Sequence, residues 1–337
     1  MTKGTKIFRI TICVLLALTM IWGLLCGAAL IFGGKYLGHK AIYNIYVAGV
    51  TVNAFNADDI LDDGTVYYDP VSNILTFNNA TIESESWPVY SQIDLNIELI
   101  GENKLICKNE VYSGGVYAGD DYLSKDLAFT GDGSLTIEIP DKCGEAVGIF
   151  ASKLTINNDI TVKISDCENK IHGIVCDSYL LIANKGTVTV NNGAAKNSVG
   201  VRVRGNALFE EGTKLNVAVN PGATEICKGL SVSGDIFLGK DTCLEALVDD
   251  EAAKESECVR VSGLMEIGTG STVKAFAKNA YAVECFGAIE VNNGAALTAA
   301  SENKDVDVFC SGALINYKAH IDGKLDAIGG VRNMSEN

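Results

Sequence analysis

The chain has 337 residues, a formal net charge of −15 at pH 7, and 35 glycines against 4 prolines. The first 40 residues hold 5 of the 27 Lys and Arg residues and no Asp or Glu, so residues 41–337 carry 22 basic against 42 acidic residues, a net −20. A domain this acidic repels phosphate backbones, which argues against nucleic acid as a partner. Abundant glycine with scarce proline favours short strands joined by tight turns.

The N-terminal segment is apolar. Residues 10–34 contain no charged side chain, and 25 residues in a helix at about 1.5 Å each exceed the roughly 30 Å hydrocarbon core of a bilayer. We therefore predict an uncleaved, single-pass transmembrane signal anchor over residues 10–34 that contacts the lipid bilayer, with a cleaved signal peptide as the alternative. The basic residues place the tail 1–9 in the cytoplasm and the rest of the chain outside it. Nine cysteines beyond the span, an odd number, argue against export.

A unit of about 24–29 residues recurs nine times between residues 94 and 330. Each unit has three segments that alternate apolar and polar residues, the pattern of strands with one buried face. A unit this short cannot bury its own apolar face and must stack on its neighbours. The sequence thus predicts an all-β fold, a right-handed parallel β-helix with three strands per coil, followed by a polar tail 331–337. A tandem of antiparallel sandwiches is the alternative.

Alternate residues in the three strands predict three columns of inward side chains. The first column is Leu127, Leu154, Leu180, Ala207, Ile236, Met265, Ile289 and Leu314. The second is Leu135, Ile160, Val188, Leu215, Leu244, Val273, Leu297 and Leu325. The third is Val116, Ile149, Ile174, Val201, Leu230, Val259, Val283 and Val308. Cys176, Cys285 and Cys310 fill a small inward slot, and we expect free buried thiols there in preference to a Cys285–Cys310 disulfide.

Residues 41–93 do not follow the repeat. They predict a small β cap, with a short helical turn after Asn56, that covers the open end of the solenoid. The segments 45–52, 63–69 and 75–82 resemble a module of bacterial cell-surface proteins that leads into parallel β-helix repeats and is often labelled carbohydrate-binding. The resemblance covers about residues 43–82. It implies a solenoid at the cell surface, and it transfers no functional residue.

Catalysis by a parallel β-helix requires carboxylates clustered over neighbouring coils, with a base close to them. The outward positions offer only the pair Glu266 and Glu290, so we expect no catalytic residue. A polysaccharide lyase or glycoside hydrolase that uses Asp120, Asp121 or the Glu266–Glu290 pair is the alternative. No Cys or His spacing fits a zinc site, and the acidic residues at 58–63 indicate a solvated turn, so we expect neither metal nor cofactor.

Two sets of outward residues are candidates for binding. The candidate ligand-binding residues are Tyr117, Asp120, Asp121, Tyr122, Phe150, Arg202 and Arg260. An aromatic platform beside polar groups is typical of sugar sites, although turn residues explain 120–122 as well. Leu181, Leu208 and Phe237 form an apolar stripe that a loop, the cap or a protein partner would cover. We therefore expect a non-catalytic, membrane-anchored surface protein for adhesion or carbohydrate contact, with a structural spacer as a further alternative.

Overall fold

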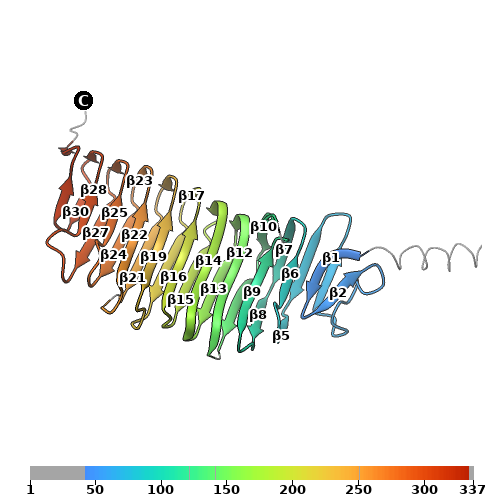
Figure 1. The fold of residues 1–337 in the computed structure, drawn as a ribbon. Coiled ribbons are helices and arrows are strands. Elements are labelled where there is room, and N and C mark those ends of the chain that lie inside the picture. The colour runs from blue at the N-terminus through green and yellow to red at the C-terminus, as the bar shows by residue number, and fades with distance from the viewer. Residues whose placement is uncertain (1–41, 121, 141, 250, 334–337) are drawn as a thin grey trace, which may run out of the picture.

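The computed structural model describes residues 42–120, 122–140, 142–249 and 251–333 of the chain. Their only regular secondary structure is β-strand, and the strands stack side by side along one axis (Figure 1). Apart from the first few, the strands pair in parallel with their equivalents one coil away. The predicted parallel β-solenoid is the observed fold, and about nine coils follow residue 94.

Each coil contributes three strands. The first strands are β4 (Ile74–Asn78), β7 (Leu95–Ile100), β10 (Leu127–Gly131), β17 (Asn206–Phe209), β20 (Ile236–Leu238), β23 (Met265–Ile267), β26 (Ile289–Val291), β29 (Leu314–Asn316) and β32 (Val331–Asn333). The second strands are β5 (Thr81–Ser84), β8 (Glu102–Cys107), β11 (Ser134–Ile139), β13 (Asp159–Ile164), β15 (Thr187–Asn192), β18 (Lys214–Val219), β21 (Cys243–Val248), β24 (Thr272–Ala277), β27 (Ala296–Ser301) and β30 (His320–Asp322). The third strands are β6 (Val89–Ser91), β9 (Tyr112–Ala118), β16 (Asn197–Val203), β19 (Ile226–Val232), β22 (Glu255–Val261), β25 (Val283–Cys285), β28 (Val308–Cys310) and β31 (Leu325–Ala327). Two long strands, β12 (Cys143–Ile156) and β14 (Cys167–Ile182), serve as the third strand of one coil and continue as the first strand of the next.

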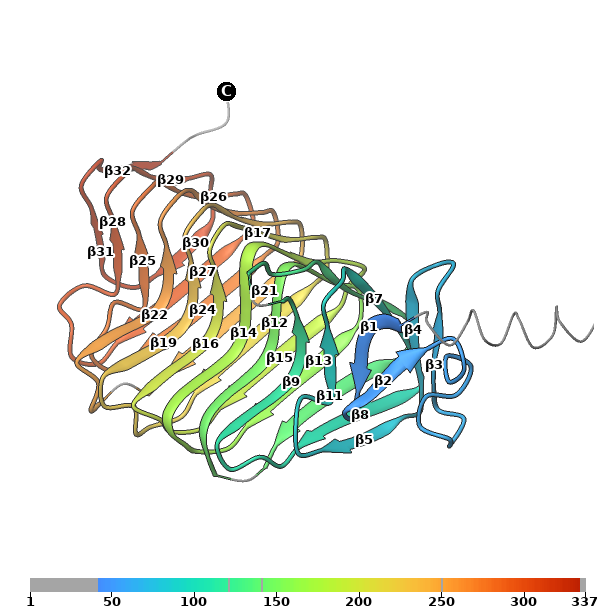
Figure 2. The same ribbon diagram turned by 45° about the vertical axis from the view of Figure 1, so that its right-hand side comes forward.

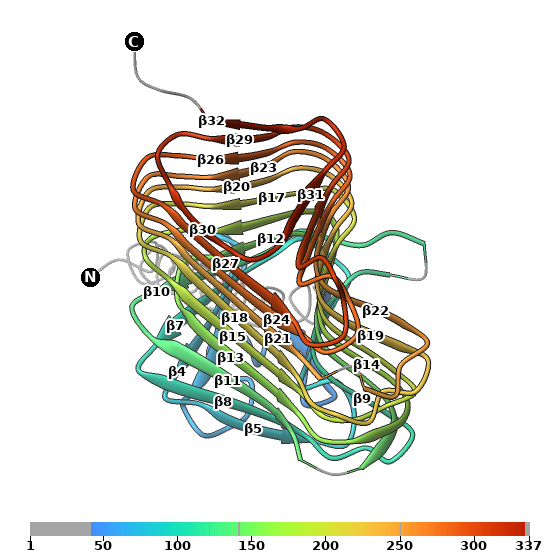
Figure 3. The same cartoon turned by 90° about the vertical axis from the view of Figure 1, so that its left-hand side faces the viewer.

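Viewed down the axis, the three rows of strands enclose the core (Figure 3). In this view the C-terminal coils are nearest the reader, and the chain runs from right to left along the upper row before descending on the left. This is the right-handed winding that the preference for right-handed parallel crossovers predicts. The third strands form one long row on the outside of the solenoid, which Figure 2 shows from the side.

The core columns stack in register. In the third column, Ile174, Val201, Leu230 and Val259 are successive partners, and each is fully buried. The first column is paired as predicted from Leu127 to Leu314. The second column is paired as predicted up to Leu297, whose next partner is Ile321. The placement of Leu325 in that column is wrong, because Leu325 belongs to the third strand and pairs with Val308.

Glycines that precede the inward residues of the third strand also stack from coil to coil. A Cβ atom on Gly200 would lie 2.7 Å from the carbonyl oxygen of Gly229, and closer still to Cγ1 of Val217. Gly173 meets the same kind of obstacle, because its Cβ would lie 2.5 Å from the oxygen of Gly200. The repeated glycine therefore allows the chain to turn against the neighbouring coil without a steric clash.

Replacing Gly200 by alanine is expected to lower the free energy of unfolding by about 1–3 kcal/mol, because the new methyl group overpacks a site walled by backbone. Urea denaturation followed by circular dichroism measures the change. The control is Glu245→Ala, an exposed position on β21, which should leave stability within about 0.5 kcal/mol of the parent. Equal midpoints for the two variants would contradict this explanation of the repeated glycine.

The cap is smaller than predicted. It consists of β1 (Ile42–Val47), β2 (Val50–Asn53) and β3 (Val66–Asp69), which pair in antiparallel fashion with one another or with the first coil. Residues 74–91 already form a complete coil, because β4, β5 and β6 pair in parallel with β7, β8 and β9. The solenoid thus begins about 20 residues before the predicted boundary at residue 94.

The predicted fold class, which combined a transmembrane helix with the solenoid, is corrected by the structure. The described residues contain no helix of any kind, and in particular none long and apolar enough to cross a membrane. The predicted span 10–34 and the tail 1–9 lie outside the described residues. The helical turn expected after Asn56 is replaced by a turn in which Asn56 Oδ1 accepts a hydrogen bond from the Asn53 amide at 2.8 Å. At the other end, residues 331–333 of the expected polar tail form β32.

Candidate ligand-binding site

A basic pocket of about 520 Å³ lies on the outer face of the third strands, across β14, β16, β19 and β22. It brings together Arg202 and Arg260, two of the predicted ligand-binding residues, although they belong to coils two steps apart. The full lining is Lys170, His172, Asn197, Val199, Arg202, Ile226, Lys228, Ser231, Ser233, Arg260 and Ser262. Four cations and several hydroxyl and amide groups therefore face one hollow.

The cations of this basic pocket differ in how they are neutralised. Glu257 is buried and forms ion pairs with Lys228, at 3.1 Å, and with Arg260. Lys228 also lies 2.6 Å from Glu255, and its ammonium group lowers the pKa of that carboxyl below the usual range. Among the residues that the structure describes, neither Lys170 nor Arg202 forms an ion pair. Lys170 and Arg202 are thus the two positive charges of the lining that no acidic side chain of the described residues compensates.

Arg260 is held in place on several sides. Its guanidinium lies over the ring of Phe286, at 4.9 Å from the ring centroid, and pairs with Glu257. Its buried Nε has no hydrogen-bond partner in the described chain, since Glu284 Oε2 is 3.9 Å away. Burial raises the pKa of Glu284, so this carboxyl is a weak counterion for Arg260. Arg260 therefore carries one buried donor that the described chain does not satisfy.

His172 forms part of the floor of the pocket. Its side chain is 7% exposed, and burial, followed by the charges of Lys170, Arg202 and Arg204, lowers its pKa to about 3. The imidazole is consequently neutral at pH 7 and presents one donor and one acceptor. A neutral imidazole suits this pocket, because a charged imidazolium would add to the repulsion among the four cations. The neutral ring can still form hydrogen bonds with a polar ligand group.

A second, larger hollow of about 670 Å³ lies along the second strands, with Glu138, Lys163, Asp166 and Lys142 in its lining. Its charges compensate one another: Glu138 pairs with Lys163 at 3.7 Å and with Lys104 at 2.7 Å. The ion pairs lower the pKa of Glu138, with the hydrogen bond from Lys104 as the main cause. This hollow has greater volume but less net charge for a ligand, so we consider the basic pocket the better candidate site.

The predicted aromatic platform is a ladder of stacked rings. Tyr117 stacks on Phe150, with ring centroids 4.7 Å apart and an interplanar angle of 12°, and on Tyr90 at 5.5 Å. Trp87 meets Tyr117 edge-on at 5.1 Å. Neighbouring rings pack against the ring of Tyr117, so its faces are not free to stack on a sugar. Tyr117 and Phe150 thus stabilise adjacent coils, and the structure does not bring them into the basic pocket.

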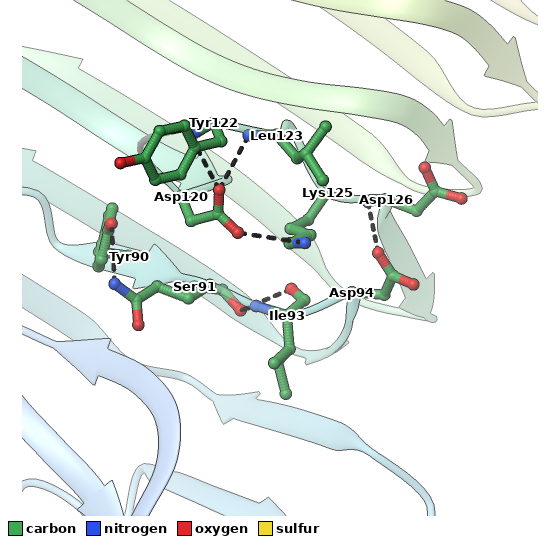
Figure 4. A network of polar contacts seen from close by, with 10 residues as sticks. Tyr90, Ser91, Ile93, Asp94, Asp120, Tyr122, Leu123, Lys125 and Asp126 are labelled. Atoms are coloured by element: carbon green, nitrogen blue, oxygen red, sulfur yellow. Dashed lines mark hydrogen bonds and ion pairs between the residues drawn. The ribbon is translucent and has the colours of Figure 1, made fainter.

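The candidates Asp120 and Tyr122, next to this ladder, lie in a turn (Figure 4). The carboxylate of Asp120 accepts hydrogen bonds from the amides of Tyr122, at 2.9 Å, and Leu123, at 2.8 Å. It also pairs with Lys125 at 3.3 Å, and the backbone hydrogen bond from Tyr122 is the main cause of its lowered pKa. The ring of Tyr122 is 92% exposed, and Asp121 lies outside the described residues. The turn interpretation therefore accounts for Asp120 and Tyr122.

The three residues of the predicted apolar stripe stack on neighbouring coils. Leu181, Leu208 and Phe237 are successive partners on β14, β17 and β20, and all three are half-buried. The cap strands pair only at the first coil, at the opposite end from the C-terminus (Figure 1), so the cap does not extend to them. A protein partner over this stripe stays a prediction.

The carboxylates considered for catalysis include one adjacent pair. Glu266 and Glu290 are register partners, and Asn292 donates a hydrogen bond to Glu266 at 3.3 Å. Neither carboxylate forms an ion pair within the described ranges. Asp59 and Asp63 accept hydrogen bonds from turn residues, and no three His, Cys, Asp or Glu side chains of the described chain are grouped to hold a metal ion.

Lys170, His172 and Lys228 were not predicted from the sequence. They lie on the part of each third strand that precedes the stacked glycine, where His172, Val199, Lys228 and Glu257 are successive register partners. The outward residues predicted to bind a ligand on these strands, Arg202 and Arg260, instead follow the inward residues Val201 and Val259. If the positions before the glycine are aligned from coil to coil, the two lysines and the histidine lie on the same strands as the two arginines.

The chain matches no family model, no curated protein and no solved structure. The resemblance of residues 43–82 to a cell-surface module is thus still an expectation from the sequence alone. What stands from the structure is a parallel β-solenoid with a basic pocket on the outer face of its third strands.

Proposed function

We propose that the protein is a non-catalytic binding scaffold whose basic pocket holds an acidic sugar unit of a glycan. The observation that carries the proposal is the lining of the pocket, where four cations surround neutral polar groups in a chain of net charge −15. The resemblance of residues 43–82 to a surface module supports a cell-surface setting for this role.

The size and chemistry of the pocket suit a sugar acid. A volume of about 520 Å³ lies within the range of about 300–1,000 Å³ typical of small-ligand sites. Arginine binds carboxylate and sulfate groups through a planar set of donors, and Arg202 has no competing acidic partner among the described residues. Ser231, Ser233 and Ser262 add hydroxyl groups for the neutral hydroxyls of the same sugar.

The acidic charge of the rest of the chain favours a ligand with localised charge over a long polyphosphate. A net −20 on residues 41–337 repels a continuous phosphate backbone, whereas one carboxylate or sulfate within the pocket meets the local cations first. The strands that carry the lining are fixed by register pairing, so binding needs no rearrangement of the backbone.

Titration calorimetry with a uronic acid oligosaccharide and with its carboxyl-reduced, neutral counterpart tests the proposal. The parent protein should bind the acidic oligosaccharide and not the neutral one, and the affinity should fall as salt is added. Arg202→Gln should weaken binding about 10-fold or more, because it removes a charge-assisted hydrogen bond worth about 1.5–3 kcal/mol.

The matched control is Arg204→Gln. Arg204 lies two residues from Arg202, pairs with Asp177 at 2.7 Å and does not line the pocket, so binding should stay within about twofold of the parent. Equal affinity for the acidic and neutral oligosaccharides, or equal losses in the two variants, would refute the proposal. No detectable binding of the folded protein to either uronate or sulfated oligosaccharides would also refute the proposal.

A further inference from the structure

Two cysteines on neighbouring coils lie in direct contact, away from the basic pocket. Cys143 and Cys167 are the first residues of β12 and β14 and are register partners across the parallel pair. Their Sγ atoms are 2.7 Å apart, and both thiols are free. Parallel strands about 4.8 Å apart satisfy the roughly 4.4–6.8 Å between Cα atoms that a disulfide requires. The backbone therefore already has the spacing of a cross-linked pair.

One of these two thiols borders an open hollow. The hollow has a volume of about 480 Å³ and is lined by Lys108, Glu110, Lys142, Cys143 and Glu168. Both cysteines are buried, Cys143 at 1% exposed and Cys167 at 5%, and of the two only Cys143 lines the hollow, so a small solute in the hollow lies next to Cys143.

The hydrogen bond between the two sulfurs gives them different roles. Either sulfur can donate this hydrogen bond, and the contact lowers the pKa of Cys143 and raises that of Cys167. The thiolate is the nucleophile in thiol–disulfide exchange, so Cys143 is the attacking sulfur and Cys167 the resolving one. The cysteine that borders the hollow is also the one whose pKa is lowered.

We infer that Cys143 and Cys167 form a site of reversible oxidation, which reacts with a small organic disulfide to give a covalent link between adjacent coils. The Cys143 thiolate attacks one sulfur of the disulfide RSSR, forms a mixed disulfide and releases one RS⁻. The Cys167 sulfur then attacks the Cys143 sulfur, and the second RS⁻ leaves. The two thiol protons pass to the two released thiolates, so RSSR is reduced to two RSH as the protein dithiol is oxidised.

A second cysteine pair provides an internal comparison. Cys285 and Cys310 are also register partners, and they are 0% and 1% exposed. A hydrogen bond from Cys285 lowers the pKa of Cys310 to about 7, so this pair is ionisable as well. Neither sulfur, however, lines the basic pocket, the hollow along the second strands or the hollow beside Cys143. The two pairs are similarly buried, and the hollow beside Cys143, not exposure or acidity alone, distinguishes them.

The test treats the folded full-length chain, in a Cys243→Ser background, with glutathione disulfide at pH 8. Cys243 is the one described cysteine that is not buried, and its removal prevents an unrelated adduct. After acid quenching, denaturation and alkylation, peptide mapping should show a Cys143–Cys167 disulfide with a mass loss of about 2 Da. Cys285 and Cys310 should still be alkylated at that time. The cross-linked protein should melt roughly 5 °C higher, and dithiothreitol should reverse the shift.

The variant Cys167→Ser should retain the far-ultraviolet circular dichroism spectrum of the parent and accumulate glutathione on Cys143. The inference is overturned if Cys143 and Cys167 are both alkylated after the treatment. It is also overturned if Cys285 and Cys310 become linked at the same rate, or if Cys167→Ser carries no glutathione at Cys143. Because none of these readouts involves a sugar, the result is independent of the proposed function.

Discussion

Replacing Phe209 by alanine is expected to lower the free energy of unfolding by about 3–5 kcal/mol. Phe209 is 1% exposed and lies near the middle of the stack, between its register partners Ile182 and Leu238. Removal of the ring leaves a cavity that these two neighbours cannot fill, because their strands are fixed by pairing on both sides. In a stacked repeat such a defect also weakens the contact between the two halves of the solenoid.

Guanidinium denaturation of Phe209→Ala, monitored by circular dichroism, measures this loss. Leu208→Ala is the matched control, because Leu208 is the preceding residue on the same strand and its half-buried side chain faces outward. The control should lose at most about 1 kcal/mol. If the two variants lost the same stability, the assignment of the inward and outward faces of β17 would be wrong.

His172 is expected to make the fold less stable in acid. Its pKa is about 3 in the folded chain, against 6.5 as the ordinary value, mainly because burial disfavours the charged ring. Below pH 6.5 the unfolded state binds a proton that the folded state does not, so stability falls as the pH falls towards 3. At about 1.4 kcal/mol per pH unit, the loss between pH 6.5 and 4.5 is roughly 2–3 kcal/mol.

Urea denaturation of the parent and of His172→Gln at pH 7 and pH 4.5 isolates this contribution. Carboxylates with lowered pKa, such as Glu138 and Glu255, also lose stabilising interactions in acid, but they do so equally in both proteins. The variant should therefore lose roughly 2–3 kcal/mol less than the parent on acidification. His320→Gln, at an exposed position, should follow the parent. Parallel pH dependences of the parent and His172→Gln would exclude a buried, neutral His172.

The core of the solenoid could be predicted because stacking places equivalent residues next to one another. A column such as Ile174, Val201, Leu230 and Val259 therefore appears in the amino-acid sequence itself as an apolar position that recurs once per coil. The period of the repeat changes at its C-terminal end. The step from Leu314 to Val331 is 17 residues, against 25 from Ile289 to Leu314, and this shortening moved Leu325 from the predicted second strand to the third.

The start of the solenoid was misplaced for a similar reason. The first coil, which ends in β6, lacks the glycine that marks the next five third strands, and its β4 pairs with the cap as well as with β7. In the site, Arg202 and Arg260 were identifiable because they share an outward column. That a pocket lies beside them depends on Lys170, Lys228 and the burial of His172, which involve strand positions that the repeat alignment did not include.

The parallel, in-register pairing of coils has a consequence for how this chain tolerates changes in length. Because each coil meets its neighbours through equivalent strands, the gain or loss of one entire unit outside the four coils of the basic pocket changes the distance from the pocket to one end by about 4.8 Å and leaves every remaining partner of like kind. The loss of a single residue within a strand instead turns the following side chains to the opposite face. The length of the solenoid can therefore vary in whole coils, with the pocket carried unchanged at a new distance from one end.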